Sequence, residues 1–204
     1  MSILKTRIGR HHCAAAAVAA GIAGSVEAAV VRWNCNLVIP ATVSGLYISI
    51  ENQIAGTSGQ SAVGWDFQLY TAGSTPSLSI FCAVGSGSMR QPGVIAGPPA
   101  SLLGGTTVGP ASNFAVSAWE VIFANSNWFW RTNATNYFGI RYVGNDGSTR
   151  YAYGRLDVGS TPNIRTLVWI DRETNANTAI TVVPAPGALA LLGLSGLARR
   201  RRRR

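Results

Sequence analysis

Histidine and lysine are nearly missing from this 204-residue sequence: the histidines are His11 and His12, and the one lysine is Lys5. Residues 13–204 therefore contain no imidazole. That absence excludes Ser-His-Asp and Cys-His catalysis and imidazole metal sites, and it removes the usual general base near neutral pH. No Walker loop or dinucleotide-binding fingerprint occurs either. We therefore expect no cofactor, no metal and no enzymatic activity.

Charged residues are also few, at 12% of the chain, and they are unevenly placed. The 17 basic and 8 acidic residues give a net charge of +9, which by itself favours a nucleic-acid or membrane-surface partner. Residues 29–183 hold eight arginines and seven acids, a net +1, whereas residues 1–28 carry +2 and residues 184–204 carry +6. The excess is terminal, which indicates targeting, so no nucleic-acid partner is expected.

The N-terminal segment has the layout of an export signal. A basic stretch precedes an apolar run, residues 13–24, which is too short to span a bilayer. Small residues after the run predict a signal peptide over residues 1–28, with cleavage between Ala28 and Ala29. Cleavage after Ser25 and a buried Ala-rich helix are the alternatives.

The C-terminal segment, residues 182–204, has three parts in order: a proline-containing break, an apolar run and a basic cluster. The break is formed by Pro184, Ala185, Pro186 and Gly187, and the cluster by Arg199, Arg200, Arg201, Arg202, Arg203 and Arg204. The apolar run is shorter than the span of about 20 residues that a bilayer asks for. We expect a short hydrophobic helix that inserts transiently in the inner membrane, with the arginines on the cytoplasmic side. The alternative is a hydrophobic tail helix that ends in a nucleic-acid-binding arginine tail, but an exported chain seldom meets nucleic acid.

This three-part segment resembles the PEP-CTERM sorting signal of bacterial exosortase substrates. Pro184, Ala185 and Pro186 stand where that family has Pro-Glu-Pro, so the motif is a variant. The resemblance implies that an exosortase-type membrane peptidase is a partner and that it cuts near the motif. It also implies a periplasmic, outer-surface or extracellular location, in bacteria that make exopolysaccharide and biofilm matrix.

The middle of the chain, residues 29–181, predicts a β-rich domain. Short strand-like segments are separated by turn-prone clusters such as 72–76, 85–97 and 159–162, and no helical periodicity is sustained. The predicted strands are 46–51, 64–71, 78–84, 118–124, 137–143, 151–158 and 165–171. This pattern indicates an all-β fold, an antiparallel β-sandwich of jelly-roll-like type, flanked by the signal peptide and the short C-terminal hydrophobic helix.

The clearest local element is a hairpin in which residues 144–148 join two strands. Asp146-Gly147 favours a tight turn, and turn chemistry explains Asn145-Asp146-Gly147 better than a calcium loop, which needs more acidic ligands. The hairpin strands also resemble the body of many PEP-CTERM proteins, in the stretches 137–142 and 150–156. The family assigns no activity to them, and we expect them to build the sandwich.

Two cysteines follow the signal peptide. Cys35 and Cys82 are too far apart in sequence for a metal knuckle. In an oxidising periplasm they predict a disulfide, and two buried thiols are the alternative.

Aromatic and acidic residues supply two further hypotheses. Trp128, Trp130 and Arg131 lie within polar flanks, where aromatic faces and a guanidinium can contact a glycan; the alternative is that both tryptophans cap the core.

Glu51, Asp66 and Glu120 fall in predicted strands, and alternation places them on the solvent face. A glycoside hydrolase, which needs two carboxylates across a cleft, is therefore the third possibility.

Together these observations predict an exported cell-surface or extracellular-matrix protein with a structural or adhesive role in the envelope or biofilm. A carbohydrate-binding module for exopolysaccharide is the second hypothesis.

Overall fold

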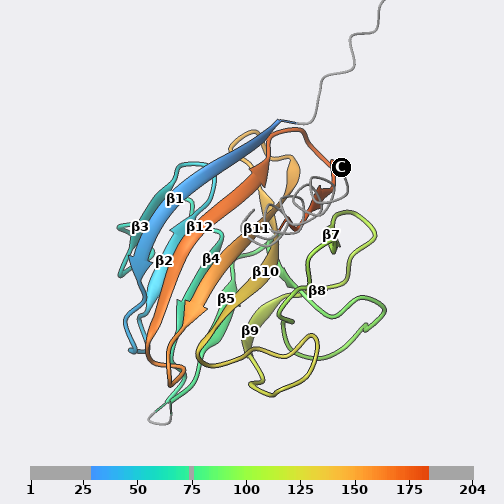
Figure 1. Cartoon of the computed structure of the whole chain (residues 1–204). Helices are drawn as coiled ribbons and strands as arrows, with labels where there is room; N and C mark the ends of the chain where they lie inside the picture. Colours follow the sequence, from blue (N-terminus) through green and yellow to red (C-terminus); the bar gives the residue numbers. More distant parts are fainter. Residues whose placement is uncertain (1–28, 74–75, 184–204) are drawn as a thin grey trace, which may run out of the picture.

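The structure, a computed structural model, describes residues 29–73 and 76–183, which form antiparallel β-sheets (Figure 1). The described residues contain no helix, and so no helix long and apolar enough to cross a membrane. The all-β prediction for the central domain is confirmed. The predicted signal peptide (1–28) and the predicted C-terminal sorting segment, with its proline-containing motif, apolar run and arginine cluster (184–204), lie outside the described residues.

The larger sheet has six strands in the order β1-β12-β11-β10-β6-β8. Its strands are β1 (Val30–Val38), β12 (Arg165–Glu173), β11 (Thr149–Val158), β10 (Ala134–Val143), β6 (Gly87–Met89) and β8 (Phe114–Ala115). The smaller sheet has five strands in the order β3-β2-β4-β5-β9. These are β3 (Ile54–Gly56), β2 (Leu46–Ser49), β4 (Phe67–Tyr70), β5 (Ser79–Cys82) and β9 (Ser117–Glu120). A two-stranded ribbon, β7 (Thr107–Val108) with β13 (Ile180–Thr181), completes the fold.

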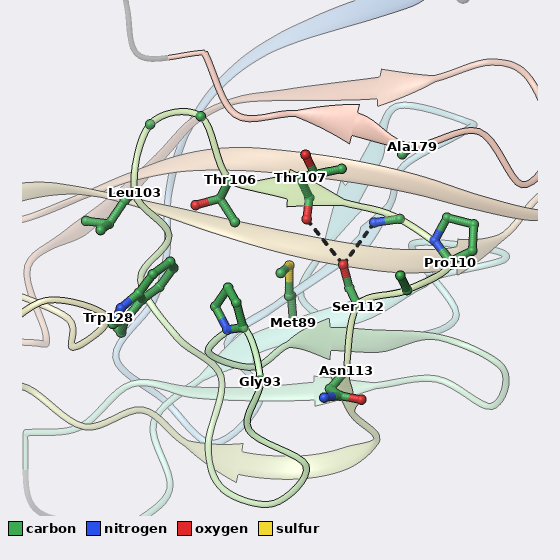
Figure 2. A pocket seen from close by; sticks show the side chains of 15 residues that line it. Met89, Gly93, Leu103, Thr106, Thr107, Pro110, Ser112, Asn113, Trp128 and Ala179 are labelled. Carbon is green, nitrogen blue, oxygen red and sulfur yellow. Dashed lines mark hydrogen bonds between the residues drawn. The ribbon is translucent and has the colours of Figure 1, made fainter.

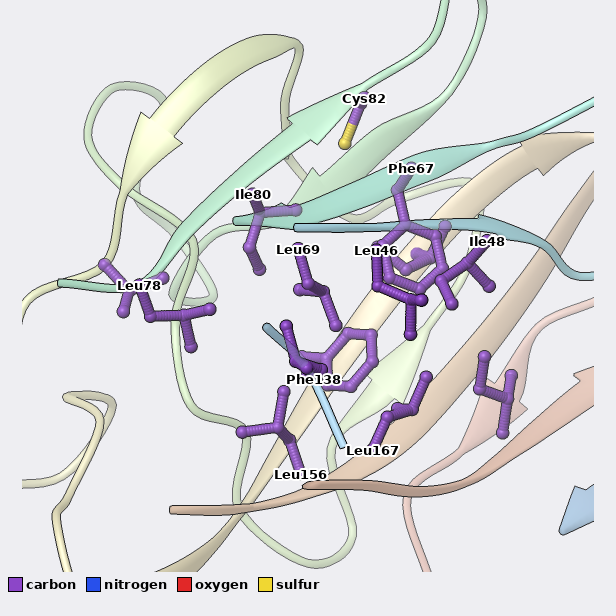
Figure 3. Close-up of a cluster of buried hydrophobic side chains, with 14 of the residues drawn as sticks. Leu46, Ile48, Phe67, Leu69, Leu78, Ile80, Cys82, Phe138, Leu156 and Leu167 are labelled. Atoms are coloured by element: carbon purple, nitrogen blue, oxygen red, sulfur yellow. The ribbon is translucent and has the colours of Figure 1, made fainter. Parts of the chain in front are cut away.

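The two sheets pack face to face over one hydrophobic core (Figure 3). The smaller sheet contributes Phe67 and Leu69, and the larger sheet contributes Phe138 and Leu156, all buried. The rings of Phe67 and Phe138 meet edge to face, with centroids 5.7 Å apart. Alternation in the strands places these side chains on one face, and each buried side chain of this size contributes about 1.5–3 kcal/mol.

The outer face of the larger sheet is covered as well. Tyr151, Tyr153 and Trp169 point away from the first core and form a second cluster with residues from loops and the ribbon. Gly139 of β10 makes this close packing possible, because a Cβ there would lie 2.9 Å from a methyl group of Val108. The fold therefore has a third layer, which the sequence did not predict and which supplies the surface described below. Val182, which the sequence division placed in the C-terminal segment, is buried in this second cluster.

The predicted hairpin is confirmed. β10 and β11 pair from Ala134↔Val158 to Val143↔Thr149. Residues 144–148 form the turn, in which Gly147 has a φ of +78°. The carboxylate of Asp146 accepts hydrogen bonds from the Ser148 amide at 3.0 Å and the Ser148 hydroxyl at 2.6 Å, so Asp146 acts as a turn residue.

The predicted disulfide is absent, because Cys35 and Cys82 are both free cysteines. Cys35 lies on edge strand β1, on the side of the molecule where β3 is the other edge (Figure 1). Cys82 lies on β5, three strands away from β3. Neighbouring strands are about 4.8 Å apart, so this offset exceeds the Cα separation of about 7 Å that a disulfide tolerates. Burial raises the pKa of Cys35 to about 11 and that of Cys82 to about 12, which keeps both as thiols.

Candidate binding site around Trp128

The aromatic segment predicted to contact a glycan does not form a regular strand, and its two tryptophans have different roles. Trp130 is 0% exposed. Its indole nitrogen donates to the carbonyl of Pro99 at 3.1 Å, and its ring stacks on Phe138 with centroids 6.2 Å apart. Trp130 has no surface for a ligand, so its predicted glycan contact is wrong and the alternative of a core residue describes it.

Trp128 is half-buried and has a φ of +70°. A left-handed backbone is rare for a bulky residue and costs about 1–2 kcal/mol. The surrounding chain holds it there: the Trp128 carbonyl accepts a hydrogen bond from the Ser101 amide at 3.0 Å, and the Phe129 amide donates to Ser126 at 3.4 Å. This turn breaks the alternation that would have put Trp128 on the same face as Trp130. Strain of this kind is concentrated at functional sites, which makes Trp128 the centre of the candidate site.

Three cavities border Trp128. The first has a volume of about 570 Å³, the second about 250 Å³ and the third about 180 Å³. The first and second share Leu103 and Gly104 in addition to Trp128, so they adjoin at this residue. The second and third share Phe129.

The first cavity is mainly apolar and built from loops (Figure 2). In Figure 2, Trp128 and Leu103 face Pro110 across it, with Met89 between them. The far wall is fixed by Ser112, whose hydroxyl accepts from the Gly109 amide at 3.1 Å and donates to the Thr107 carbonyl at 3.2 Å. This cavity therefore offers apolar surface with a hydroxyl-bearing rim.

The second cavity is lined by both apolar and polar residues, and Arg131 borders it. Asn136, 1% exposed, clamps the Arg131 backbone: its carbonyl oxygen accepts from the Arg131 amide at 2.9 Å, and its amide nitrogen donates to the Arg131 carbonyl at 3.0 Å. The Ser101 hydroxyl also donates to the side-chain carbonyl oxygen of Asn136, at 3.3 Å. The Arg131 side chain is exposed and also borders a fourth cavity, of about 220 Å³.

Arg131 differs from the other arginines that the structure describes. Its guanidinium has no hydrogen bond or ion pair with any described residue. By contrast, Arg32, Arg150, Arg155 and Arg172 pair with acids. Arg90 and Arg165 donate to backbone carbonyls, and Arg141 lies over the ring of Phe114. An arginine without an ion pair thus borders the second cavity.

No carboxylate lines any of these four cavities. The predicted solvent-facing position of Asp66 is wrong: Asp66 is 5% exposed, and its carboxylate accepts a hydrogen bond from the Ile50 amide at 2.7 Å. Burial raises the pKa of Asp66 to about 7. Glu51 pairs with Arg150, and Glu120 lies exposed on edge strand β9. None of these three acids lines any of the four cavities.

Metal ligands do not gather in the folded domain: across 29–73 and 76–183, no three His, Cys, Asp or Glu side chains group so as to hold a metal ion. Comparison with protein-family models, curated proteins and solved structures finds no significant match to the chain. Function therefore has to be inferred from the chain's own residues.

Proposed function

We propose that this is an exported cell-surface or extracellular-matrix protein with a structural or adhesive role in the bacterial envelope or biofilm. The observation that carries the proposal is the distribution of charge. The domain of residues 29–183 is nearly neutral at +1, and it is flanked by a basic, apolar N-terminal segment and by an apolar run with six terminal arginines. Such flanks are typical of targeting signals.

In this proposal the two ends route the protein. The signal peptide directs export and is removed between Ala28 and Ala29. The C-terminal helix holds the chain in the inner membrane until an exosortase-type peptidase cuts near Pro184-Ala185-Pro186. The remaining domain, a jelly-roll-like sandwich, is then free at the surface or in the matrix.

The folded domain supports an adhesive role more than a catalytic one. Its described cavities contain no carboxylate and its sequence has no histidine or lysine after residue 12. Its buried residues are used for packing, with a core on each face of the larger sheet.

Intact-mass analysis of the protein from the native host tests the routing. We expect a species that begins at Ala29 and lacks the arginine cluster. Replacing the six arginines with serine should leave the N-terminal cut intact and stop the C-terminal one. A full-length chain retained in the cytoplasm would contradict the proposal.

A second candidate is a carbohydrate-binding module for exopolysaccharide. The half-buried, strained Trp128 beside three cavities favours it, because an aromatic ring that borders a cavity with nearby polar groups suits a sugar ring. Retention of the full chain on immobilised exopolysaccharide from the host, compared with that of a Trp128→Gly variant, tests this candidate.

A further inference from the structure

We propose that the cavity between Trp128 and Arg131 binds an acidic sugar residue of a polysaccharide. The sugar ring lies against the indole of Trp128, and its carboxylate pairs with the guanidinium of Arg131. The inference rests on the proposed adhesive function and its carbohydrate-binding form, and it names the chemical class of the ligand.

The charge of the site selects an anion. Arg131 lacks an internal partner, and no acid lines any of the four cavities described above. Arginine presents a planar fork that matches both oxygens of a carboxylate. An uncompensated guanidinium in a hollow free of acids therefore attracts and orients a carboxylate-bearing ligand, whereas a neutral sugar gains only ordinary hydrogen bonds.

The sizes of the two adjoining cavities suit one sugar unit in the smaller cavity and the next unit of the chain in the larger one. A volume of about 250 Å³ is below the range of about 300–1,000 Å³ usual for drug-sized ligands, so this cavity suits one sugar unit. The adjoining cavity of about 570 Å³ shares Leu103, Gly104 and Trp128 with it and offers room for the next unit of a chain. The side chain of Asn127 is exposed at the edge of the smaller cavity, where its amide can bind sugar hydroxyls.

The site is fixed before a ligand arrives. Asn136 holds the Arg131 backbone through two hydrogen bonds, and Ser101 ties the Trp128 carbonyl to the neighbouring loop. The left-handed backbone of Trp128 is stored strain that positions the indole. Preorganisation of this kind lowers the entropy cost of binding.

Titration calorimetry of the full chain with acidic and neutral trisaccharides tests the proposal. The acidic probes are trigalacturonate and trimannuronate, and the neutral probe is maltotriose. All proteins carry serine in place of the six arginines at 199–204, so that the tail cannot bind the polyanion. We expect an acidic probe to bind at least about tenfold more tightly than maltotriose, the gain expected from a charge-assisted hydrogen bond.

Variants assign the binding to the site. Arg131→Gln should weaken binding of the acidic probe about tenfold and leave maltotriose nearly unchanged. Trp128→Gly should weaken both, and because glycine tolerates a φ of +70°, this variant keeps the fold. The control is Trp119→Ala, at a residue that borders none of the four cavities, and it should bind as the parent does.

The inference is overturned if neither acidic probe binds, if maltotriose binds equally well, or if Arg131→Gln has no effect. These failures are separable from failure of the proposed function. A chain that is exported and cut at both ends but ignores both acidic probes overturns this inference alone. A chain that binds them but stays uncut in the cytoplasm overturns the proposed routing alone.

Discussion

Asp171 on β12 binds Arg32 on β1 through both of its carboxylate oxygens, each 2.6 Å from a guanidinium nitrogen. The Arg32 guanidinium also lies over the ring of Trp169, 4.2 Å from its centroid. Asp171 is 3% exposed, so its negative charge depends on this one cationic partner. The contact joins the edge strand to the rest of the larger sheet, and Asp171 raises the pKa of Arg32 above its usual value.

The Arg32 side chain is itself 43% exposed, but because its partner Asp171 is buried, removing Arg32 should cost more than removing an arginine whose partner is exposed. We expect Arg32→Met, which keeps an apolar stem, to lower the free energy of unfolding by about 1–3 kcal/mol, because it leaves Asp171 buried without its partner. Arg155→Met is the matched control. Its pair with Asp157 is 28% and 39% exposed, and its loss should cost less than about 1 kcal/mol. Urea unfolding of the full chain measures both, and equal losses would contradict this account.

Asp66 should make stability depend on pH in the direction opposite to most carboxylates. Its folded-state pKa, about 7, lies above the ordinary value of 3.8, mainly because of burial and also because of nearby Glu51. The folded protein then holds the proton more tightly than the unfolded chain. The contribution of Asp66 to stability is therefore fully present below about pH 4 and is lost as the pH rises to about 7.

Asp66→Asn isolates this effect, because asparagine stays neutral and can still accept the hydrogen bond from Ile50. We expect the stability of the variant relative to the parent to rise by roughly 3 kcal/mol between about pH 5 and about pH 8. Urea midpoints at several pH values provide the measurement. A difference that does not change with pH would show that Asp66 titrates normally.

The two cysteines should behave as protected thiols. We expect the exported protein to have the mass of the form with two free thiols, and its melting temperature to be the same with and without reductant. Raised pKa values of about 11 and about 12 predict slow reaction with alkylating reagents at neutral pH until the chain is unfolded. A mass lower by two hydrogens, with a melting temperature that falls on reduction, would contradict the free-thiol structure.

Sequence patterns located most of the sandwich because its central strands alternate. Each of the seven predicted segments overlaps a strand, and the hairpin turn at Asp146-Gly147 has the residues that a tight turn needs. β1 is not among the predicted strands, although Val31, Trp33, Cys35 and Leu37 alternate with Arg32, Asn34 and Asn36, which is the pattern of a half-buried strand. β6 lies within a segment predicted as turns, because Gly87 and Ser88, its residues paired with β10, carry no apolar side chain that would indicate a strand.

The sequence allowed only part of the candidate site to be predicted. Trp128 and Arg131 stood out as an aromatic and a cation in polar surroundings. Leu103 and Gly104, which line the same cavities as Trp128, could not be predicted from the sequence. They lie in loops of the third layer, and loops have no periodic pattern that would indicate their position. The different roles of Trp128 and Trp130 were also hidden, since parity along a strand predicts one face for both, and the left-handed turn at Trp128 overrides it.

Trp130 and Trp128 should also differ in how much each contributes to the stability of the domain. Trp130→Ala removes a fully buried indole, its stacking on Phe138 and its hydrogen bond to Pro99, and should destabilise the domain by about 3–5 kcal/mol. Trp128→Gly loses part of a half-buried ring but relieves a backbone strain of about 1–2 kcal/mol, so its stability should stay within about 1 kcal/mol of the parent.

Urea unfolding compares the two variants in the full chain, with Trp119→Ala as the control for loss of an exposed tryptophan at the edge of the smaller sheet. If Trp128→Gly is as costly as Trp130→Ala, Trp128 is a packing residue and its strained turn serves the fold. If Trp128→Gly is nearly neutral in stability, the domain does not need the indole of Trp128 in order to fold.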